Sequence, residues 1–380
     1  MPLHRALPAV LIALALPACT AATAAPPAEA RVATFNASLN RAADGELVAD
    51  LSTPDDPQAR EVAEVVQRVR PDVLLVNEFD HAPAAVDLFR DNYLERGQNG
   101  AEPIEYPYAF LAPSNTGVPS GFDLDNDGAV GGPNDALGFG AFPGQYGMLV
   151  LSRFPIDTTA TRTFQRFLWK DLPGSRQPTD FYSPEEQAVL PLSSKSHWDV
   201  AVRIGDRTLH VLASHPTPPT FDGPEDRNGR RNADEIAFWR LYVQPGAAGD
   251  ALYDDAGRRG GLGAGERFVI LGDQNSDPLD GDSLAGAAEQ ILTAHRVLDP
   301  APASDGAAEA ANPGHRGDPR LDTADFSDPT PGNLRVDYVL PSAPLEVLRS
   351  GVFWPVAADP LARLNDASDH HATWVDLRLP

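Results

Sequence analysis

The sequence predicts an α/β fold in which mixed β-sheets carry helices on their outer sides. Short apolar runs typical of strands alternate with polar loops, and a few segments show a helical period instead. Gly205-Asp206 separates strand-like runs at 200–204 and 208–213, which predicts a hairpin and therefore antiparallel pairing. Because hairpins occur among strand–helix units, the pattern argues against a regular parallel barrel.

Each further element rests on its own local pattern. A strand is expected at 32–36, and the stretch 57–69 is expected to be a helix because its valines recur with a period near 3.6 residues. Asn77-Glu78 follows a strand expected at 72–76, which is apolar from Val73 onward. The remaining elements expected are strands at 148–151, 267–271, 334–340 and 373–377 and a helix at 231–243. Loops of a length that is usually functional or mobile are expected at 114–145, 216–230 and 301–332.

The composition limits the classes of protein to be considered. With 380 residues, the chain is long enough for one large domain or two smaller ones. Its 30 basic and 54 acidic residues give a formal charge of -24. Such a surface repels polyanions, so binding of nucleic acid through a basic face is not implied. A phosphate-bearing substrate would need a metal ion or a local arginine cluster to overcome this field.

Residues 1–25 are expected to form a signal peptide, because a short basic start precedes an apolar stretch that is too short to span a bilayer. Two processing routes remain open. Ala22-Thr23-Ala24 fits an ordinary signal-peptidase site, whereas Leu16-Pro17-Ala18-Cys19 resembles a lipobox in which Cys19, the one cysteine of the chain, carries the lipid. Either route predicts an exported protein that is secreted, periplasmic or lipid-anchored. Residues 26–30 are expected to form a short tether.

Polar side chains stand where the expected strands end. Gly272-Asp273-Gln274-Asn275 follows one strand, Arg335-Val336-Asp337-Tyr338 lies within another, and Ser368-Asp369-His370 precedes a third. A side chain at a strand end is held rigidly by the sheet yet can face solvent, which suits polar chemistry. In chain order, the polar groups at strand ends are Asn36, Glu78, His215, Asp273, Asn275, Asp337, Asp369 and His370.

These residue types indicate a site for a hard cation and for proton transfer. Oxygen ligands such as those of Glu78, Asp369 and Asn36 suit Mg²⁺ or Mn²⁺. Histidines beside carboxylates can move protons near neutral pH. The sequence contains no cysteine–histidine cluster with zinc spacing, no phosphate loop of the Gly-Lys-Ser/Thr type and no Gly-x-Ser-x-Gly elbow.

In their order along the chain, these motifs resemble those of the endonuclease/exonuclease/phosphatase superfamily, which has the DNase I-like fold. Asn36 at the end of the first strand, Glu78, the stretch from Tyr146 to Pro155 and His215 match the pattern, as do the three motifs above. The resemblance covers nearly all of the chain after the expected signal peptide. It implies a single domain at 31–380 with a four-layer α/β sandwich of two packed mixed β-sheets flanked by helices.

The resemblance also implies a hydrolase that acts on phosphoric ester bonds. Glu78, Asn36 and Asp369 would hold Mg²⁺ or Mn²⁺ on a nonbridging phosphate oxygen, where the metal acts as a Lewis acid. Asp337 would orient His370 by accepting a hydrogen bond from one ring nitrogen. The catalytic residues implied are His215, Asp273, Asn275, Asp337 and His370.

Within this set, Asp273 would position the attacking water or the leaving group, and Asn275 would donate to the phosphoryl oxygens. His215 would contact the phosphate or protonate the leaving oxygen. The substrate stays open among nucleic acid, a phospholipid and a small phosphate ester. No protein partner is implied, a monomer is expected, and membrane contact would come only from a lipid anchor. The alternative hypothesis is a catalytically degenerate, surface-binding module of the same fold.

Two weaker groups complete the predicted sites. Tyr146, Arg230 and Arg231 are candidate substrate contacts. The loop with Asp123, Asp125 and Asp127 imitates the start of an EF-hand, which suggests a structural Ca²⁺, but its twelfth position is asparagine instead of glutamate. Acidic residues that merely turn the chain are an equally good interpretation of this loop.

Overall fold

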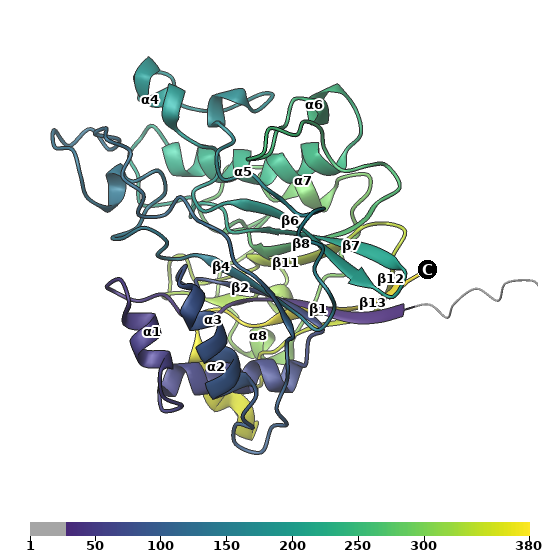
Figure 1. The fold of residues 1–380 in the computed structure, drawn as a ribbon. Coiled ribbons are helices and arrows are strands. Elements are labelled where there is room, and N and C mark those ends of the chain that lie inside the picture. Colours follow the sequence, from purple (N-terminus) through teal and green to yellow (C-terminus); the bar gives the residue numbers. More distant parts are fainter. Residues whose placement is uncertain (1–27) are drawn as a thin grey trace, which may run out of the picture.

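The computed structural model describes residues 28–380, so the expected signal peptide, Cys19 and the start of the expected tether lie outside the described residues. Two mixed β-sheets pack face to face, and helices cover their outer sides (Figure 1). The predicted four-layer α/β sandwich is therefore confirmed. Within the described part of the chain, no helix combines the length and apolar character needed to span a membrane.

The two large sheets differ in the order of their strands and in the number of strands. The first sheet contains, in spatial order, β12 (Glu346–Val352), β13 (Thr373–Leu379), β1 (Ala28–Asn36), β2 (Val73–Asn77), β4 (Met148–Ser152) and β3 (Tyr108–Phe110). The second contains β11 (Asp337–Pro341), β8 (Arg267–Asp273), β7 (Arg207–Ser214), β6 (His197–Ile204) and β5 (Arg162–Thr163). A small third sheet pairs β10 (Asn333–Leu334) with β9 (Ala324–Asp325). In the large sheets, β1 pairs with β2 and β7 pairs with β8 in parallel.

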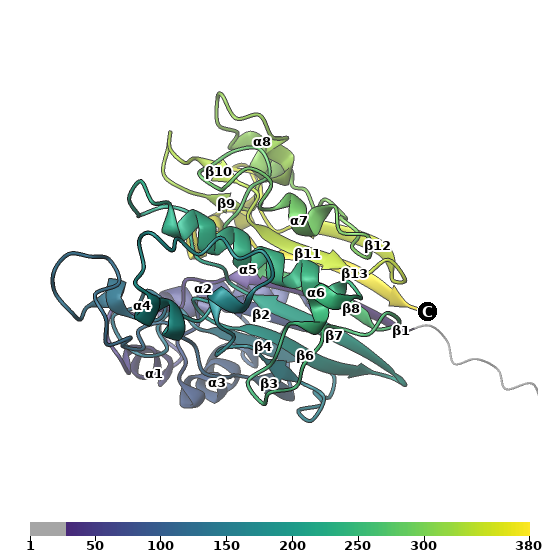
Figure 2. The ribbon, with the colours of Figure 1, turned by 90° about the horizontal axis from the view of Figure 1, so that it is seen from above.

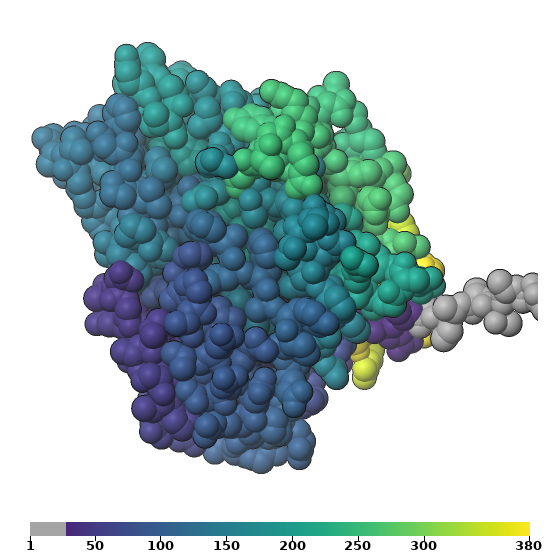
Figure 3. Space-filling model, viewed as in Figure 1, coloured from purple at the N-terminus to yellow at the C-terminus, as the bar shows by residue number. Residues whose placement is uncertain are grey.

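The helices form the outer layers. The helix bounds are α1 (Glu46–Leu51), α2 (Pro57–Val69), α3 (Pro83–Phe89), α4 (Pro184–Val189), α5 (Arg227–Val243), α6 (Ala247–Asp250), α7 (Glu289–Leu292) and α8 (Asp305–Glu309). Helices α1, α2 and α3 lie on the first sheet, and α5 and α7 lie across the second (Figures 1 and 2). In the space-filling view, purple and blue residues form the lower half of the molecule, and teal and green residues form most of the upper half, with blue residues again at the upper left (Figure 3).

The alternation of side chains between the two faces of each strand produces the layers of the fold. In β2, Val73 and Leu75 pack in the core between the two sheets, whereas Leu74 and Val76 pack against the helices outside. This follows from the two-residue period of a strand, which sends successive side chains to opposite faces. Because both faces are covered, the strand is apolar throughout. Each such buried side chain contributes about 1.5–3 kcal/mol of transfer free energy.

Helix α2 begins and ends where its sequence specifies. The Asp56 carboxylate accepts a hydrogen bond from the backbone N–H of Ala59 at 2.8 Å, and Pro57 takes the first helical position, where no N–H is needed. Arg70 ends the helix with a left-handed backbone, at φ 54°. The observed bounds are those predicted from the valine period.

Several predicted segments differ from the structure. The stretch at 301–332 was expected to be a loop but contains α8 and β9, and β6 begins at His197, three residues before the strand expected at 200–204. Strand β1 begins at Ala28, so 28–30 belong to the sheet and not to a tether, because they pair with the end of β13. Helix α5 begins at Arg227, four residues before the predicted start. The strand predicted at 334–340 is divided between β10 and β11, because the backbone N–H groups of Val336 and Asp337 both donate to the Thr323 hydroxyl.

A buried network ties β6 and β7 to α5 at some distance from the predicted site. The His210 Nδ1 atom lies 2.7 Å from Asp199 Oδ1, and the Tyr242 hydroxyl donates to Asp199 Oδ2 at 2.6 Å. His210 Nε2 faces Glu266 at 3.6 Å. Burial lowers the pKa of His210, but Asp199 and then Glu266 outweigh this effect, so the pKa is raised.

Replacing His210 by glutamine should destabilise the protein most at acidic pH. A raised pKa in the folded state adds stability that is fully present below the unfolded value of about 6.5 and is lost as pH rises through the folded value. A loss of about 1–3 kcal/mol is expected near pH 6, the usual range for a hydrogen bond to a charged group. Urea unfolding from pH 5.5 to 10 measures this difference, and a difference that stays constant over the range would contradict the account.

Candidate active site

Four strand ends from the two sheets meet at one edge of the sandwich. Asn36 ends β1, Asn77 ends β2, Ser214 ends β7 and Asp273 ends β8. The Asn77 amide links the sheets, because its oxygen accepts from the backbone N–H of Asp273 at 3.2 Å and its nitrogen donates to the Ser214 carbonyl at 3.4 Å. The parallel pairs β1–β2 and β7–β8 place these ends together, so the site is built on rigid elements.

Asp273 is the centre of the site. Its carboxylate is buried and accepts hydrogen bonds from the Asn36 amide at 3.1 Å and from the backbone N–H of Asn275 at 2.8 Å. His215 Nε2 lies 3.3 Å and His370 Nε2 3.7 Å from Asp273 Oδ2. Asp273 thus brings together four of the side chains that the sequence placed at strand ends.

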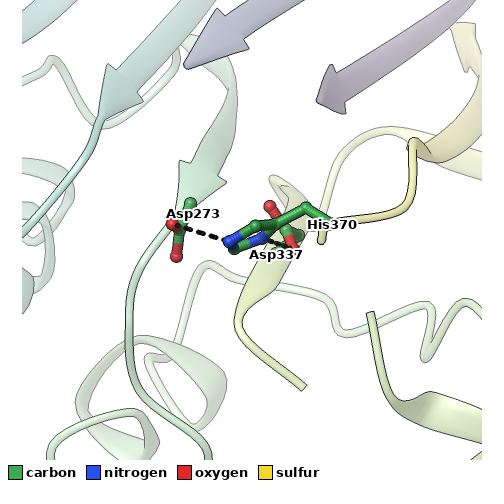
Figure 4. A group of neighbouring side chains, drawn as sticks. All are labelled: Asp273, Asp337 and His370. Atoms are coloured by element: carbon green, nitrogen blue, oxygen red, sulfur yellow. Dashed lines mark hydrogen bonds and ion pairs between the residues drawn. The ribbon is translucent and has the colours of Figure 1, made fainter. Parts of the chain in front are cut away.

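His370 lies between two carboxylates. Its Nδ1 atom is 2.8 Å from Asp337 Oδ2, and the opposite edge of the ring faces Asp273 (Figure 4). The backbone N–H of Asp337 donates to the Thr323 hydroxyl at 2.9 Å, which fixes the start of β11. The ring therefore lies where the resemblance implied, with Asp337 as its partner.

The charges of the buried groups favour ionisation of Asp273 and protonation of His370. Burial would lower the pKa of His370, but the carboxylates of Asp337 and Asp273 outweigh it and raise the pKa to about 10. Burial would likewise raise the pKa of Asp273, but His370 and His215 hold it well below its ordinary range. These directions favour an imidazolium beside an ionised carboxylate: the protonated ring can donate to a phosphate oxygen, whereas the carboxylate can accept from a water molecule.

Several residues at the site have a left-handed backbone, which non-glycine residues adopt only a few per cent of the time. Their φ angles are 48° at Ser38, 58° at Glu78, 55° at Tyr146 and 49° at Asn275. Each such residue costs of order 1–3 kcal/mol when it is strained, and it persists only where the surroundings determine it. Such residues cluster at active sites in other proteins, so four of them at this edge are consistent with the candidate site, although residues elsewhere, such as Arg70 and Ala301, share this conformation.

The residues fit a hard divalent cation. Glu78 is half-buried, and its Oε2 atom accepts from the Asn40 amide at 2.7 Å, which orients the carboxylate. Among residues 28–380, Glu78 Oε1 has no hydrogen bond and is free to coordinate a metal. Asn36 contacts Asp273, whereas Asp369 is exposed and accepts from the Ser38 hydroxyl at 3.2 Å. These donors are oxygens, the ligands that Mg²⁺ and Mn²⁺ prefer.

A second group could also hold a cation. Ligand atoms of Asp273, Asp337 and His370 lie within 4.8 Å of one another, and Asp337 Oδ1 is buried with no hydrogen-bond partner among the described residues. The sequence assigned these three residues to catalysis and the metal to Glu78. The structure therefore offers a second position for a cation between the two aspartates, which His370 can join as a ligand only after it loses a proton.

The candidate substrate contacts have different surroundings. The backbone N–H of Tyr146 donates to the Asp80 carboxylate at 3.1 Å, and burial, followed by the negative charges of Glu78 and Asp80, raises the pKa of the Tyr146 phenol. The Arg230 side chain has no hydrogen bond or ion pair within the described part of the chain. Arg231 donates to the backbone carbonyls of Leu137, Pro191 and Leu192. This arrangement favours a structural role for Arg231 over the substrate contact expected from the sequence.

Asn275 and the acidic loop also have partners of their own. The Asn275 amide donates to the Pro216 carbonyl at 3.1 Å and lies 3.3 Å from Asp273, so it holds the loop after β7 against the loop after β8.

The carboxylates of Asp123, Asp125 and Asp127 converge within 4.8 Å, but they also accept hydrogen bonds from backbone N–H groups of the same loop. Both the cation and the turn interpretations of this loop therefore stand.

Four residues that contribute to the site were not predicted. Asn77 and Asn40 support Asp273 and Glu78, and Thr323 supports Asp337. Lys195 is buried next to Ser194, which the Glu235 carboxylate ties to Thr217 in the loop after β7. Asn77 had a signal, because it directly precedes Glu78 at a strand end. Thr323 and Lys195 lie in irregular segments, where no local pattern marks them.

The comparisons with known proteins agree with this arrangement. A sequence model of the Endonuclease/Exonuclease/phosphatase family matches residues 33–370. No curated protein shows a significant match to the chain. Among solved structures, an endonuclease/exonuclease/phosphatase from Beutenbergia cavernae aligns with a TM-score of 0.52 and 17% identity, over 93% of this chain and 72% of its own.

Two further solved structures are similar at a lower level. Sphingomyelinase C from Streptomyces griseocarneus has a TM-score of 0.48 and 15% identity, over 93% of this chain and 99% of its own. TDP2 from Caenorhabditis elegans has a TM-score of 0.45 and 14% identity, over 92% of this chain and 75% of its own. At these identities the likeness concerns the fold alone. The family match spans most of the sequence, and the chain therefore belongs to the endonuclease/exonuclease/phosphatase family.

Proposed function

We propose that the chain is a divalent-metal-dependent phosphohydrolase that cleaves a phosphate ester. The observation that carries this proposal is the buried series Asp337–His370–Asp273 at the joined strand ends, beside the strained and half-buried Glu78. Members of the family are generally hydrolases of phosphoester bonds, and the donors at this edge suit that chemistry. Export is part of the proposal and rests on the sequence of residues 1–25 alone.

In the proposed mechanism each residue has one task. Asp337 holds Nδ1 of His370, so that the imidazolium turns its other N–H toward the phosphate and balances charge on the phosphoryl oxygens. Asp273, kept ionised, accepts a proton from the attacking water or orients it. His215 Nε2 lies beside Asp273 and is placed to donate to the leaving oxygen.

The metal position fits around Glu78. A bound Mg²⁺ or Mn²⁺ would supply Lewis-acid polarisation of a phosphoryl oxygen. Glu78 provides a free carboxylate oxygen, and the Asn40 amide orients this carboxylate. Asn36 ends β1 beside β2, the strand that precedes Glu78, and its amide donates to Asp273. A binding module without catalysis would not need an ionised aspartate, a protonated histidine and an oriented carboxylate at one edge, so the structure favours the enzyme over the degenerate module.

A substrate panel tests the proposal. With Mg²⁺ or Mn²⁺, the mature protein should hydrolyse at least one ester among double-stranded DNA, RNA, sphingomyelin, bis-nitrophenyl phosphate and inositol phosphates. Product formation is measured for each with and without chelator. If the folded protein binds the metal, measured by calorimetry, and yet cleaves none of these esters, the surface-binding alternative replaces the proposal.

A further inference from the structure

The chain contains only two lysines, and their surroundings are opposite. Lys170 is exposed, whereas Lys195 retains only 6% of its accessible surface. Arginine supplies the remaining basic residues of the chain. Burying a lysine removes a strongly hydrated ammonium from water, and this is rarely tolerated unless the ammonium is paired. The position of Lys195 therefore needs an explanation.

The backbone places Lys195 next to the catalytic edge. In the β6–β7 ladder, His197 pairs with Ser214, the residue directly before His215. Before this pair the chain leaves the ladder, but the Glu235 carboxylate accepts from the backbone N–H groups of both Ser194 and Thr217, which holds the segment around Lys195 beside Pro216. The Asn275 amide donates to the Pro216 carbonyl, so the backbone of Lys195 lies beside the loops that carry His215 and Asn275.

Helix α5 and the loop at 114–145 fix this backbone. Glu235 of α5 accepts from the backbone N–H groups of Ser194 at 2.7 Å and of Thr217 at 2.6 Å, which joins the segments before β6 and after β7. The Lys195 carbonyl accepts from the backbone N–H of Asn115 at 2.8 Å. Gly138 approaches so closely that a Cβ there would lie 1.9 Å from the Ser194 carbonyl oxygen. These contacts leave the backbone around Lys195 little conformational freedom.

The Lys195 ammonium has no partner among residues 28–380, where it makes neither a hydrogen bond nor an ion pair. Glu235, the carboxylate with the strongest effect on it, is already bound by the Ser194 and Thr217 N–H groups and by the Ser194 hydroxyl. The next strongest effects come from Glu78 and Asp273. An unpaired cation thus lies within the electrostatic field of the two carboxylates at the centre of the site.

We propose that Lys195 binds a nonbridging oxygen of the substrate phosphate, and of the phosphate product. This inference rests on the proposed function. A phosphate that lies between Glu78 and Asp273 gives Lys195 the anionic partner that the protein alone does not provide. A charge-assisted hydrogen bond to phosphate is stronger than a neutral one, and exclusion of water strengthens it further.

Burial lowers the pKa of Lys195 although the nearby carboxylates raise it. Phosphate binding adds negative charge beside the ammonium and should favour its protonated form. A lysine whose only role was to offset the charge of Glu235 would keep its pKa when phosphate binds. Glu235 is held by Ser194 and Thr217 of the protein itself, and phosphate would not change these contacts. The two roles therefore differ in a measurable response.

Because there are only two lysines, nuclear magnetic resonance can observe Lys195 directly. The mature protein is prepared with lysine labelled at Cε with ¹³C, and Lys170→Arg identifies the two signals. Inorganic phosphate is then added. The Lys195 signal is expected to shift with saturation, while the Lys170 signal, the matched control in the same spectrum, stays in place. If phosphate shifts histidine signals of the site but leaves the Lys195 signal unchanged, the inference is wrong and the proposed function stands.

Variants give the second readout. Lys195→Met should weaken phosphate binding on the order of 10- to 100-fold, the range expected for loss of a hydrogen bond to a charged group. Lys195→Arg, which keeps the charge, should restore part of the affinity, and Lys170→Met should leave it unchanged. Phosphate binding by Lys195→Met at the affinity of the unaltered protein would refute the role. If the unaltered protein neither binds phosphate nor cleaves any ester, the proposed function itself fails.

Discussion

Asp337→Asn is expected to lower turnover by about three to four orders of magnitude while the fold and the substrate affinity stay nearly intact. Asparagine keeps the shape of the side chain, but it can present an N–H to Nδ1 of His370 and so favour the wrong tautomer. It also removes the charge that, with Asp273, raises the pKa of His370 to about 10. Steady-state kinetics with the responsive ester of the panel, together with circular dichroism, measure these effects.

The double variant decides whether the two residues act as a unit. His370→Ala should cost a factor similar to that of Asp337→Asn, and combining the two should be hardly worse than either alone. His371→Gln is the matched control. His371 neighbours His370 in sequence but packs on the Trp354 ring at 3.7 Å between ring centroids, so its loss should affect stability more than turnover. Losses that multiply in the double variant would show that Asp337 does not act through His370.

Glu78→Gln is expected to lower the affinity for Mn²⁺ by at least about 10- to 100-fold, the loss typical when only an outer partner of a metal ligand is removed. Glutamine keeps an oxygen for the Asn40 amide but loses the charge that attracts the cation. Activity should fall with the affinity and return in part at high metal concentration. Titration with Mn²⁺, followed by electron paramagnetic resonance, provides the measurement.

Two controls locate the cation. Asp123→Asn changes the exposed acidic loop and should leave the affinity of the catalytic position unaltered. Asp273→Asn changes the second group in which ligand atoms converge. If Glu78→Gln titrates as the unaltered protein does, and Asp273→Asn does not, the cation belongs between Asp273, Asp337 and His370, and the assignment of Glu78 is wrong.

The sequence predicted those parts of the fold that are encoded locally. Helix α2 was predicted with its observed bounds from the valine period alone, and the Asp56 cap and Pro57, which fix its start, are also local to the segment. Strand ends were also found, since an apolar run followed by Asp273 or Glu78 is a local signal. The start of β1 was missed, because its first residues become a strand only by pairing with β13, which is distant in sequence.

The site could be predicted only in part for the same reason. The identities of Asp337 and His370 were read from the motifs, but their contact was implied by the resemblance and not by any spacing. Thr323 and Lys195 depend on tertiary contacts of irregular segments. Arg231 follows His215 in the sequence, yet its guanidinium donates to backbone carbonyls of neighbouring loops. Local patterns carry no information on such contacts.

The central claim is that this edge of the sandwich performs metal-dependent cleavage of a phosphate ester. The most direct measurement is release of nitrophenol from bis-nitrophenyl phosphate by the mature protein and by His370→Ala, each with Mn²⁺, with chelator, and with Mn²⁺ restored. The account predicts turnover by the unaltered protein that disappears with chelator, returns with Mn²⁺, and falls by orders of magnitude in His370→Ala. Full turnover in chelator, or equal turnover by His370→Ala, would contradict it.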